Sequence, residues 1–415
     1  MLTPPSDSDR LLLRDLAQRV AEIAADPVQE QKRRMWYRHN ALQSGRPLVL
    51  VFPEGAWEEI LPGAVCECGD PHWRGVEWGL RAKLLQWAHF PDDNPVEAEL
   101  AVPRAVERTD WGVPFAHVQS DTPRGSFTFD PPLKDPGDIS RLRYPTISHD
   151  AEETQRWVEV YQETFGDLLR VSARYGEWTE ANLAYLMTEL RGLDQMMVDM
   201  CDRPAFVHEL AEFLTAGLLK LLDERERQGL LSLNNGGHYV GSGGVGYTHE
   251  LPAADFDGTH VRPRDLWGFG EAQELALVSP EMHDEFVLQY QIRILERYGL
   301  NCYGCCEDTI KRFEVIRRVP RLRRISVCPW ADTQRAAETL QDRYVFSWKP
   351  NPAMVAGERL DTEWIRTAIG KAIGDARGCV LEMILKDTHT VRGELSRFTE
   401  WTRIVLELAE EAAGM

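Results

Sequence analysis

The chain has 415 residues, of which 43% are hydrophobic and 27% charged, and its formal net charge is −19 at pH 7. This composition is typical of a globular protein, and the negative charge disfavours nucleic acid and anionic membrane surfaces as partners. No apolar run reaches the roughly 18 residues of a membrane helix, and the first residues lack the features of a secretory signal. We therefore expect a cytoplasmic protein, and its eight cysteines are too few for a disulfide framework.

The N-terminal part of the chain is predicted to be helical. Residues 11–42 have an amphipathic pattern interrupted near Pro27, without a buried-strand signal, so we predict a helical cap over residues 1–45. The apolar run at residues 47–52 is typical of a parallel strand covered on both faces. Further along, residues 109–130 have the pattern of a β-hairpin.

The second half of the chain alternates between predicted helices and short apolar strands. Such βα units form an open doubly wound sheet or a closed barrel. We favour a (β/α)8 TIM barrel over residues 46–415 with an N-terminal helical extension, because no glycine-rich turn follows the first strand. The expected strands are at residues 230–235, 265–271, 323–332, 344–352 and 379–387, and a further one leads into the stretch 300–309. The expected helices are at 194–228, with a break near Pro204, and at 280–298, 310–319, 333–340, 362–376 and 396–413.

A barrel of this kind carries its functional groups at the carboxyl ends of its strands, where this sequence places several unusual polar residues. These residues are candidates for proton transfer and for binding a ligand or cofactor. The catalytic candidates are Glu54, His238, Glu271 and Tyr303, and the binding candidates are Asn234, Trp330, Lys349 and Asn351.

The stretch LNCYGCCEDT at residues 300–309 combines two thiols and two carboxylates at an expected strand end. Thiolate, imidazole and carboxylate groups suit Zn²⁺, so we take Cys305, Cys306, Glu307 and His389 as candidate ligands. An alternative is that one cysteine is a small core residue, that Glu307 caps the next helix, and that His389 is a rim histidine.

Three other motifs have weaker interpretations. Residues 241–246 (GSGGVG) match a nucleotide-binding pattern but open no clear helix, so residues 234–252 are either a mobile active-site loop or a plain connection. Residues 66–72 (CECGDPH) resemble half of a zinc knuckle without its second half and indicate a loop. The arginine-rich residues 317–324 indicate a solvated connection.

Taken together, the βα series, PLVLVFPEG at residues 47–55, the cysteine turn and CVLEMILKDTHT at residues 379–390 resemble the uroporphyrinogen decarboxylase superfamily over about residues 46–415. The chain looks more like the zinc-dependent corrinoid methyltransferases of this superfamily than like the decarboxylase. Where the decarboxylase has two arginines after its first strand, this chain has Phe52, Pro53 and Glu54. The zinc motif of the methyltransferases is altered here, since Tyr303 or Gly304 replaces its histidine and His389 its last cysteine.

The resemblance implies a metal-dependent methyl transferase. Zinc would activate a small acceptor, the methyl group would be exchanged with a corrinoid on a separate protein, and the chain would form a homodimer. Two alternatives remain: a decarboxylase or lyase that uses Glu54, Glu271 or Asp332 as proton donor, and a barrel that binds a small ligand without turning it over.

Overall fold

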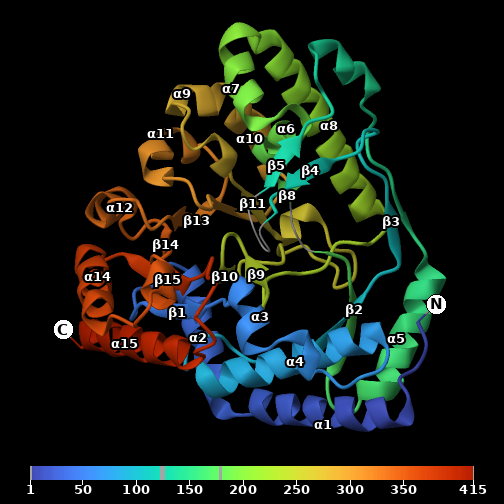
Figure 1. Cartoon of the computed structure of the whole chain (residues 1–415), viewed down its shortest axis with the longest axis vertical. Helices are drawn as coiled ribbons and strands as arrows, with labels where there is room; N and C mark the ends of the chain where they lie inside the picture. The colour runs from blue at the N-terminus through green and yellow to red at the C-terminus, as the bar shows by residue number, and fades with distance from the viewer. Residues whose placement is uncertain (1, 122–126, 177–179, 415) are drawn as a thin grey trace.

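The computed structural model describes residues 2–121, 127–176 and 180–414. Its centre is a seven-stranded sheet with the order β1-β15-β14-β13-β12-β11-β8, in which every neighbouring pair is parallel (Figure 1). The strands are β1 Leu48–Val51, β8 Glu180–Ala181, β11 Trp267–Gly270, β12 Leu300–Tyr303, β13 Leu322–Val327, β14 Val345–Trp348 and β15 Val380–Leu385.

The strand order follows the chain from β8 to β15 and then returns to β1. The predicted α/β class with parallel strands is therefore confirmed. Within the described ranges, no ladder of hydrogen bonds joins the two edge strands β1 and β8.

Helices connect these strands and cover one face of the sheet. Because neighbouring residues of a strand point to opposite faces, Ile325, Phe346 and Met383 face the helices and belong to the largest apolar core. The helices after β8 are α6 Leu183–Arg191, α7 Leu193–Asp202, α8 Pro204–Arg227, α9 Pro280–His283, α10 Gln289–Leu295, α11 Phe313–Ile316, α12 Thr333–Leu340, α13 Ala353–Ala356, α14 Thr362–Asp375 and α15 Ser396–Ala413. Short 3-10 turns lie at Glu54–Ala56, Gly63–Val65, Pro136–Arg141, Pro263–Asp265, Gln273–Leu275 and Thr309–Arg312, and a π-helical turn at Asp284–Leu288.

The other face of the sheet is covered by a buried hairpin of β9 Tyr239–Val240 and β10 Gly244–Val245. Its glycines allow close approach: a Cβ atom on Gly241 would lie 2.6 Å from Cys302 Cβ, and one on Gly244 would lie 2.3 Å from Arg324 Cζ. Residues 240–248 are thus buried against the sheet. The two interpretations of residues 234–252, an active-site loop and a plain connection, stay predictions. Residues 230–235 form no strand, contrary to expectation.

A buried charged cluster also lies on this inner face. Arg324 Nε is 2.9 Å from Glu382 Oε1, and His39 Nε2 is 3.0 Å from Glu382 Oε2. Burial alone would raise the pKa of Glu382, but Arg324 and His39 hold that pKa far below its ordinary value. The prediction that residues 317–324 are solvated is therefore wrong for Arg324. The cluster ties helix α2 (Pro27–Asn40) to the sheet.

The N-terminal helix α1 (Asp7–Ala24) packs on α4 (Pro71–His89) and α5 (Ala151–Phe165), below the sheet in Figure 1. These elements share a separate apolar cluster. Beside them lie α3 Trp57–Ile60, the parallel pair β2 Glu99–Pro103 and β7 Arg170–Arg174, and the antiparallel pair β3 Val106–Arg108 and β6 Ile147–His149.

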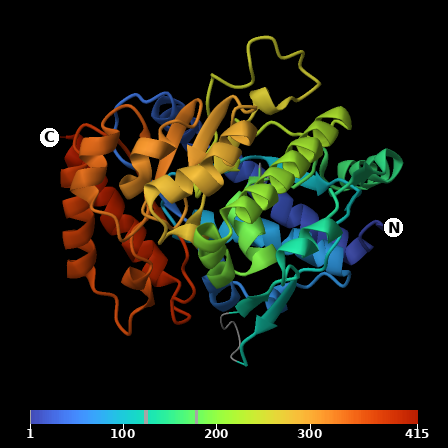
Figure 2. The same ribbon diagram turned by 90° about the horizontal axis from the view of Figure 1, so that it is seen from above.

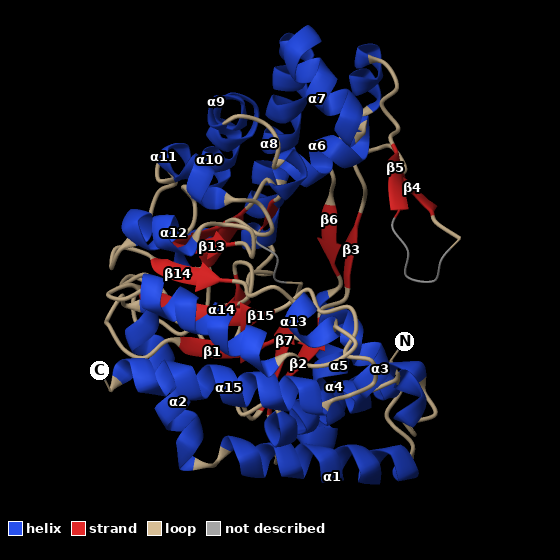
Figure 3. Cartoon of the chain, turned by 60° about the vertical axis from the view of Figure 1, so that its left-hand side comes forward, coloured by secondary structure: helices blue, strands red, loops and turns tan. Residues whose placement is uncertain are grey.

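Two excursions leave the main body. The strands β4 (Ala116–Gln119) and β5 (Phe127–Asp130) pair antiparallel, as expected for the hairpin predicted at residues 109–130, of which residues 122–126 lie outside the described residues (Figure 3). The pair contacts helix α6, where His117 Nε2 lies 3.1 Å from Glu189 Oε1. A long connection near residue 255 projects at the top of Figure 2. Of the helices in the described residues, none is long and apolar enough to cross a membrane.

Candidate functional site

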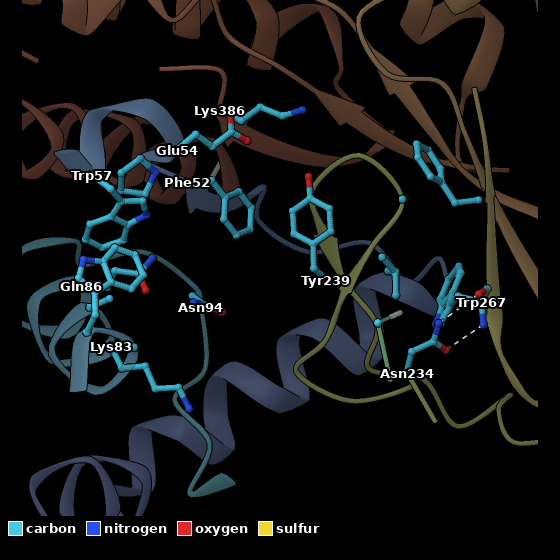
Figure 4. Close-up of a pocket in the computed structure, with 18 of the residues that line it drawn as sticks. Phe52, Glu54, Trp57, Lys83, Gln86, Asn94, Asn234, Tyr239, Trp267 and Lys386 are labelled. Carbon is cyan, nitrogen blue, oxygen red and sulfur yellow. Dashed lines mark hydrogen bonds between the residues drawn. The ribbon is translucent and has the colours of Figure 1, made fainter. Parts of the chain in front are cut away.

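A cavity of about 800 Å³ is bounded by helix α4, by the residues that directly follow strand β1, and by the β9–β10 hairpin (Figure 4). It lies beside the carboxyl ends of β1 and β15, where a parallel α/β fold carries its functional groups. Its aromatic lining residues are Phe52, Trp57, Trp78, Tyr239, Trp267 and Phe269, and its polar ones are Glu54, Lys83, Gln86, Asn94, Asn234 and Lys386.

Two strained residues meet at one end of this cavity. Glu54 has a φ of 47° and Asp387 a φ of 57°, a left-handed conformation that is costly for residues with a Cβ atom. They are joined by a hydrogen bond of 2.7 Å from the Asp387 amide nitrogen to Glu54 Oε2. Burial raises the pKa of Glu54, so this carboxyl keeps its proton to a higher pH than an exposed glutamate does.

A chain of polar contacts runs from the cavity wall to the cysteine pair. Lys386 Nζ lies 3.4 Å from Ser242 Oγ, which in turn lies 3.4 Å from Cys305 Sγ. Cys305 Sγ is 3.6 Å from Cys306 Sγ, and Cys306 Sγ is 3.9 Å from Asp387 Oδ2. Lys386 Nζ is also 3.4 Å from Asp387 Oδ1, so the contacts close into a ring.

This environment favours a thiolate at Cys305. The hydrogen bond from the Cys306 thiol, the positive charge of Lys386 and the hydroxyl of Ser242 together lower the pKa of Cys305 to about 6, against the effect of burial. Donating to Cys305 raises the pKa of the Cys306 thiol, so Cys306 stays protonated. Cys305 is half-buried and Cys306 exposed.

The four candidate zinc ligands are only partly brought together. Cys305 and Cys306 are adjacent, but the Glu307 carboxylate accepts hydrogen bonds from the backbone nitrogens of Ala272 (3.0 Å) and Cys305 (2.8 Å). His389 packs on the turn after β1, where a Cβ atom on Gly55 would lie 3.3 Å from its Nδ1. In the described part of the chain, no group of three or more His, Cys, Asp or Glu side chains is arranged to hold a metal ion. The predicted ligand set does not fit a zinc ion in this arrangement.

The catalytic candidates Tyr303 and Glu271 do not line the cavity. Tyr303 faces the helices, and its hydroxyl is 2.9 Å from His283 Nε2 and 2.7 Å from Gln291 Oε1. Glu271 is buried, and burial and two nearby carboxylates, Glu274 and Glu307, raise its pKa well above the ordinary value. Both residues thus belong to the packing behind the site.

The other candidates are scattered around the sheet. Asn234 lines the cavity, but its side chain is engaged by the backbone nitrogen and oxygen of Trp267. Lys349 is buried and donates to Ser347, and burial lowers the pKa of Lys349 to about 7. Lys349 and the remaining three do not line the cavity: His238 precedes the hairpin, Trp330 is 73% exposed, and Asn351 accepts a hydrogen bond from Ala353 nitrogen.

The sequence analysis missed Lys386, Ser242 and Lys83. Lys386 could have been found from the two-residue repeat of a strand. Residues 382, 384 and 386 follow this repeat and therefore share the inner face of β15 and its extension. Lys83 and Ser242 could not have been found, because tertiary packing alone brings helix α4 with Lys83 to the cavity and the hairpin with Ser242 to Cys305.

No family model matches the chain, and no curated protein matches it. A methyltransferase from Methanosarcina mazei is similar in structure, with 9% sequence identity and a TM-score of 0.48 over 90% of this chain and 97% of that chain. At this identity and TM-score, the likeness carries no argument about the activity of the chain.

Proposed function

We propose that the chain is an enzyme that transfers a methyl or other one-carbon group to and from a small molecule held in the 800 Å³ cavity. The observation that carries this proposal is the position of Cys305, whose sulfur lies 3.6 Å from Cys306 Sγ and 3.4 Å from Ser242 Oγ, and which Ser242 links to Lys386 in the cavity wall. These neighbours lower the pKa of Cys305 to about 6. A thiolate is a soft nucleophile suited to a methyl carbon. The resemblance of the strand ends to the uroporphyrinogen decarboxylase superfamily supports the choice of the methyl group.

We further propose that the parallel sheet is the (β/α)8 barrel of that superfamily. The return of the strand order from β15 to β1 supports this, because such an order is that of a barrel. A corrinoid protein as the second methyl carrier and a homodimer stay predictions from the resemblance.

The proposed reaction has two displacements at the methyl carbon, with the sulfur of Cys305 as the nucleophile in the first and the leaving group in the second. The Cys305 thiolate attacks the methyl carbon of a substrate, the sulfur–carbon bond forms, and the bond from the methyl group to the leaving atom breaks. The leaving atom keeps the electron pair and takes the proton of Glu54, whose raised pKa suits it to act as an acid. An external acceptor then attacks the methyl carbon, the sulfur–carbon bond breaks with its electron pair on Cys305, and the proton of the acceptor passes to Glu54.

Peptide mass spectrometry tests this proposal directly. The protein is incubated with a panel of carbon-13 methyl ethers, methyl thioethers and methylamines, and the label on each cysteine is measured. We expect label on Cys305 in the wild type and in Cys306→Ser, and none in Cys305→Ser. Transfer by Cys305→Ser at the wild-type rate, or label on Cys306 alone, would contradict the proposal.

Zinc is tested separately by metal analysis of the purified protein and by activity after dialysis against a chelator. If the thiolate acts without zinc, methyl transfer survives the chelator. Loss of transfer that returns with added Zn²⁺ would instead restore the zinc prediction with a ligand set other than the one proposed from the sequence.

Decarboxylation is a second candidate, favoured by the raised pKa of Glu54 beside the cation of Lys386. Lys386 would hold a substrate carboxylate, and Glu54 would protonate the carbanion that loss of carbon dioxide leaves. Incubation with porphyrinogens and measurement of carboxylate loss tests it. Retention of this activity in Cys305→Ser would separate it from methyl transfer.

A further inference from the structure

A second cavity of about 190 Å³ adjoins the large one. The two cavities share part of their walls, because Lys83, Gln86 and Asn94 line both. Figure 4 shows Lys83 at the end of the large cavity away from Glu54 and Lys386. A ligand that reaches from Glu54 to Lys83 would thus meet the small cavity at its far end.

Two lysines line the small cavity without an ion-pair partner. Lys83 Nζ donates to the backbone oxygen of Glu99 at 2.9 Å, and Lys32 Nζ donates to that of Asn94 at 3.2 Å. Within the described ranges, no carboxylate oxygen lies within 4.0 Å of either nitrogen. Each ammonium has three N–H donors, so both keep donors for a ligand.

Burial makes this arrangement unfavourable in the empty protein. Burial lowers the pKa of Lys83 and of Lys32. Carboxylates beyond ion-pair distance, Glu97 and Glu99 for Lys83 and Asp92 and Asp93 for Lys32, offset only part of this effect. An anionic group within hydrogen-bond distance of either ammonium would offset more of it, so the two lysines of this wall are suited to bind an anion.

The acids of the same wall are engaged elsewhere. Asp92 accepts hydrogen bonds from the backbone nitrogens of Val51 and Asn94, each 3.1 Å long, and burial raises the pKa of Asp92 to about 7. Glu97 is 3.2 Å from Arg33 Nη1 and accepts a hydrogen bond from the Tyr247 hydroxyl. Neither carboxylate forms an ion pair with the two lysines.

We propose that Lys83 and Lys32 form a subsite for an anionic oxygen group of the substrate, a carboxylate or a phosphate. The substrate is then an elongated molecule whose apolar middle lies between aromatic walls that include Trp57 and Tyr239, with its reacting end near Glu54. This inference rests on the proposed function only for the identity of the reacting end.

Calorimetric titration of the full chain tests the subsite with three probes: 3-phenylpropionate, 3-phenylpropan-1-ol and 3-phenylpropyl phosphate. We expect the acid to bind about tenfold more tightly than the alcohol, since a hydrogen bond to a charged group is worth that much or more. Lys83→Met should abolish this difference and Lys83→Arg should keep it. The exposed Lys134→Met is the matched control and should bind as the wild type does. Tighter binding of the phosphate than of the acid identifies a phosphate site, and the reverse a carboxylate site.

Equal binding of acid and alcohol by the wild type, including no binding of either, would overturn the subsite, as would unchanged preference in Lys83→Met. Urea unfolding of each variant shows whether it folds, and Lys32→Met replaces Lys83→Met if the latter does not. Cys305 labelling is measured on the same variants. If Lys83→Met loses the preference for the anion while Cys305 is still labelled, the result supports the subsite independently of the reaction. If Cys305 of the wild type is not labelled, only the methyl-transfer proposal is contradicted.

Discussion

Lys386 is the residue on which the charge of Cys305 depends most after Cys306 itself. We predict that Lys386→Met raises the pKa of Cys305 by about one unit, because the nearby positive charge is lost. The pH dependence of Cys305 alkylation by iodoacetamide measures this, read from the peptide mass. Lys386→Arg should keep the low pKa, and the exposed, remote Lys371→Met should have no effect. An unchanged pH profile in Lys386→Met would show that the lysine does not stabilise the thiolate.

His283 is a buried histidine that makes stability depend on pH. Burial, with the nearby charge of Arg312, lowers its pKa to about 3, whereas the unfolded chain titrates near 6.5. Between these values the unfolded state binds a proton that the folded state does not, so stability falls as the pH falls.

We therefore predict that His283→Gln makes the pH dependence of the free energy of unfolding shallower by ~1.4 kcal/mol per pH unit between about pH 6 and pH 4. Urea unfolding at several pH values measures the slope. A slope equal to that of the wild type would mean that His283 is protonated in the folded protein.

At the scale of elements, the buried β9–β10 hairpin depends on glycines that touch the sheet. Gly244→Ala would place a Cβ atom 2.3 Å from Arg324 Cζ, and we predict a loss of about 1 to 3 kcal/mol in the free energy of unfolding. Gly75→Ala is the control, because Gly75 lies in α4 with nothing within 4 Å of the added atom. That variant should be as stable as the wild type or up to about 1 kcal/mol more stable.

The sequence was most informative about amphipathic helices. The helices at residues 333–340 and 396–413 begin and end where the pattern predicts, because their periodicity extends over the whole element. The run at residues 230–235 was taken for a strand and forms none, since a short apolar run does not distinguish a strand from a buried connection.

The residue types of the candidate site could be predicted from the sequence, but the contacts between these residues could not. Cys305, Cys306 and Glu54 could be selected because thiols and an acid at strand ends are unusual in packing. The contacts of Glu307 with backbone nitrogens and of Tyr303 with His283 depend on tertiary packing, which no local pattern contains.

At the scale of the whole molecule, α1 closes the second apolar cluster and supports α4, which carries Trp78 and Lys83 at the cavity. We predict that Leu13→Ala lowers the free energy of unfolding by about 2 to 5 kcal/mol, because Leu13 is fully buried in that cluster. Leu11→Ala, at a position that is 74% exposed, should change it by less than about 0.5 kcal/mol. Equal effects in chemical denaturation would show that α1 does not pack as described.

The contact of His39 with Glu382 joins the second helix to the last strand, 343 residues apart in the chain. During synthesis, the beginning of the protein leaves the ribosome long before its partner strand exists. The nascent chain therefore holds β1 and α2 without their final neighbours until translation is nearly finished. Truncation near the C-terminus should accordingly harm the folding of the first fifty residues as much as that of the last.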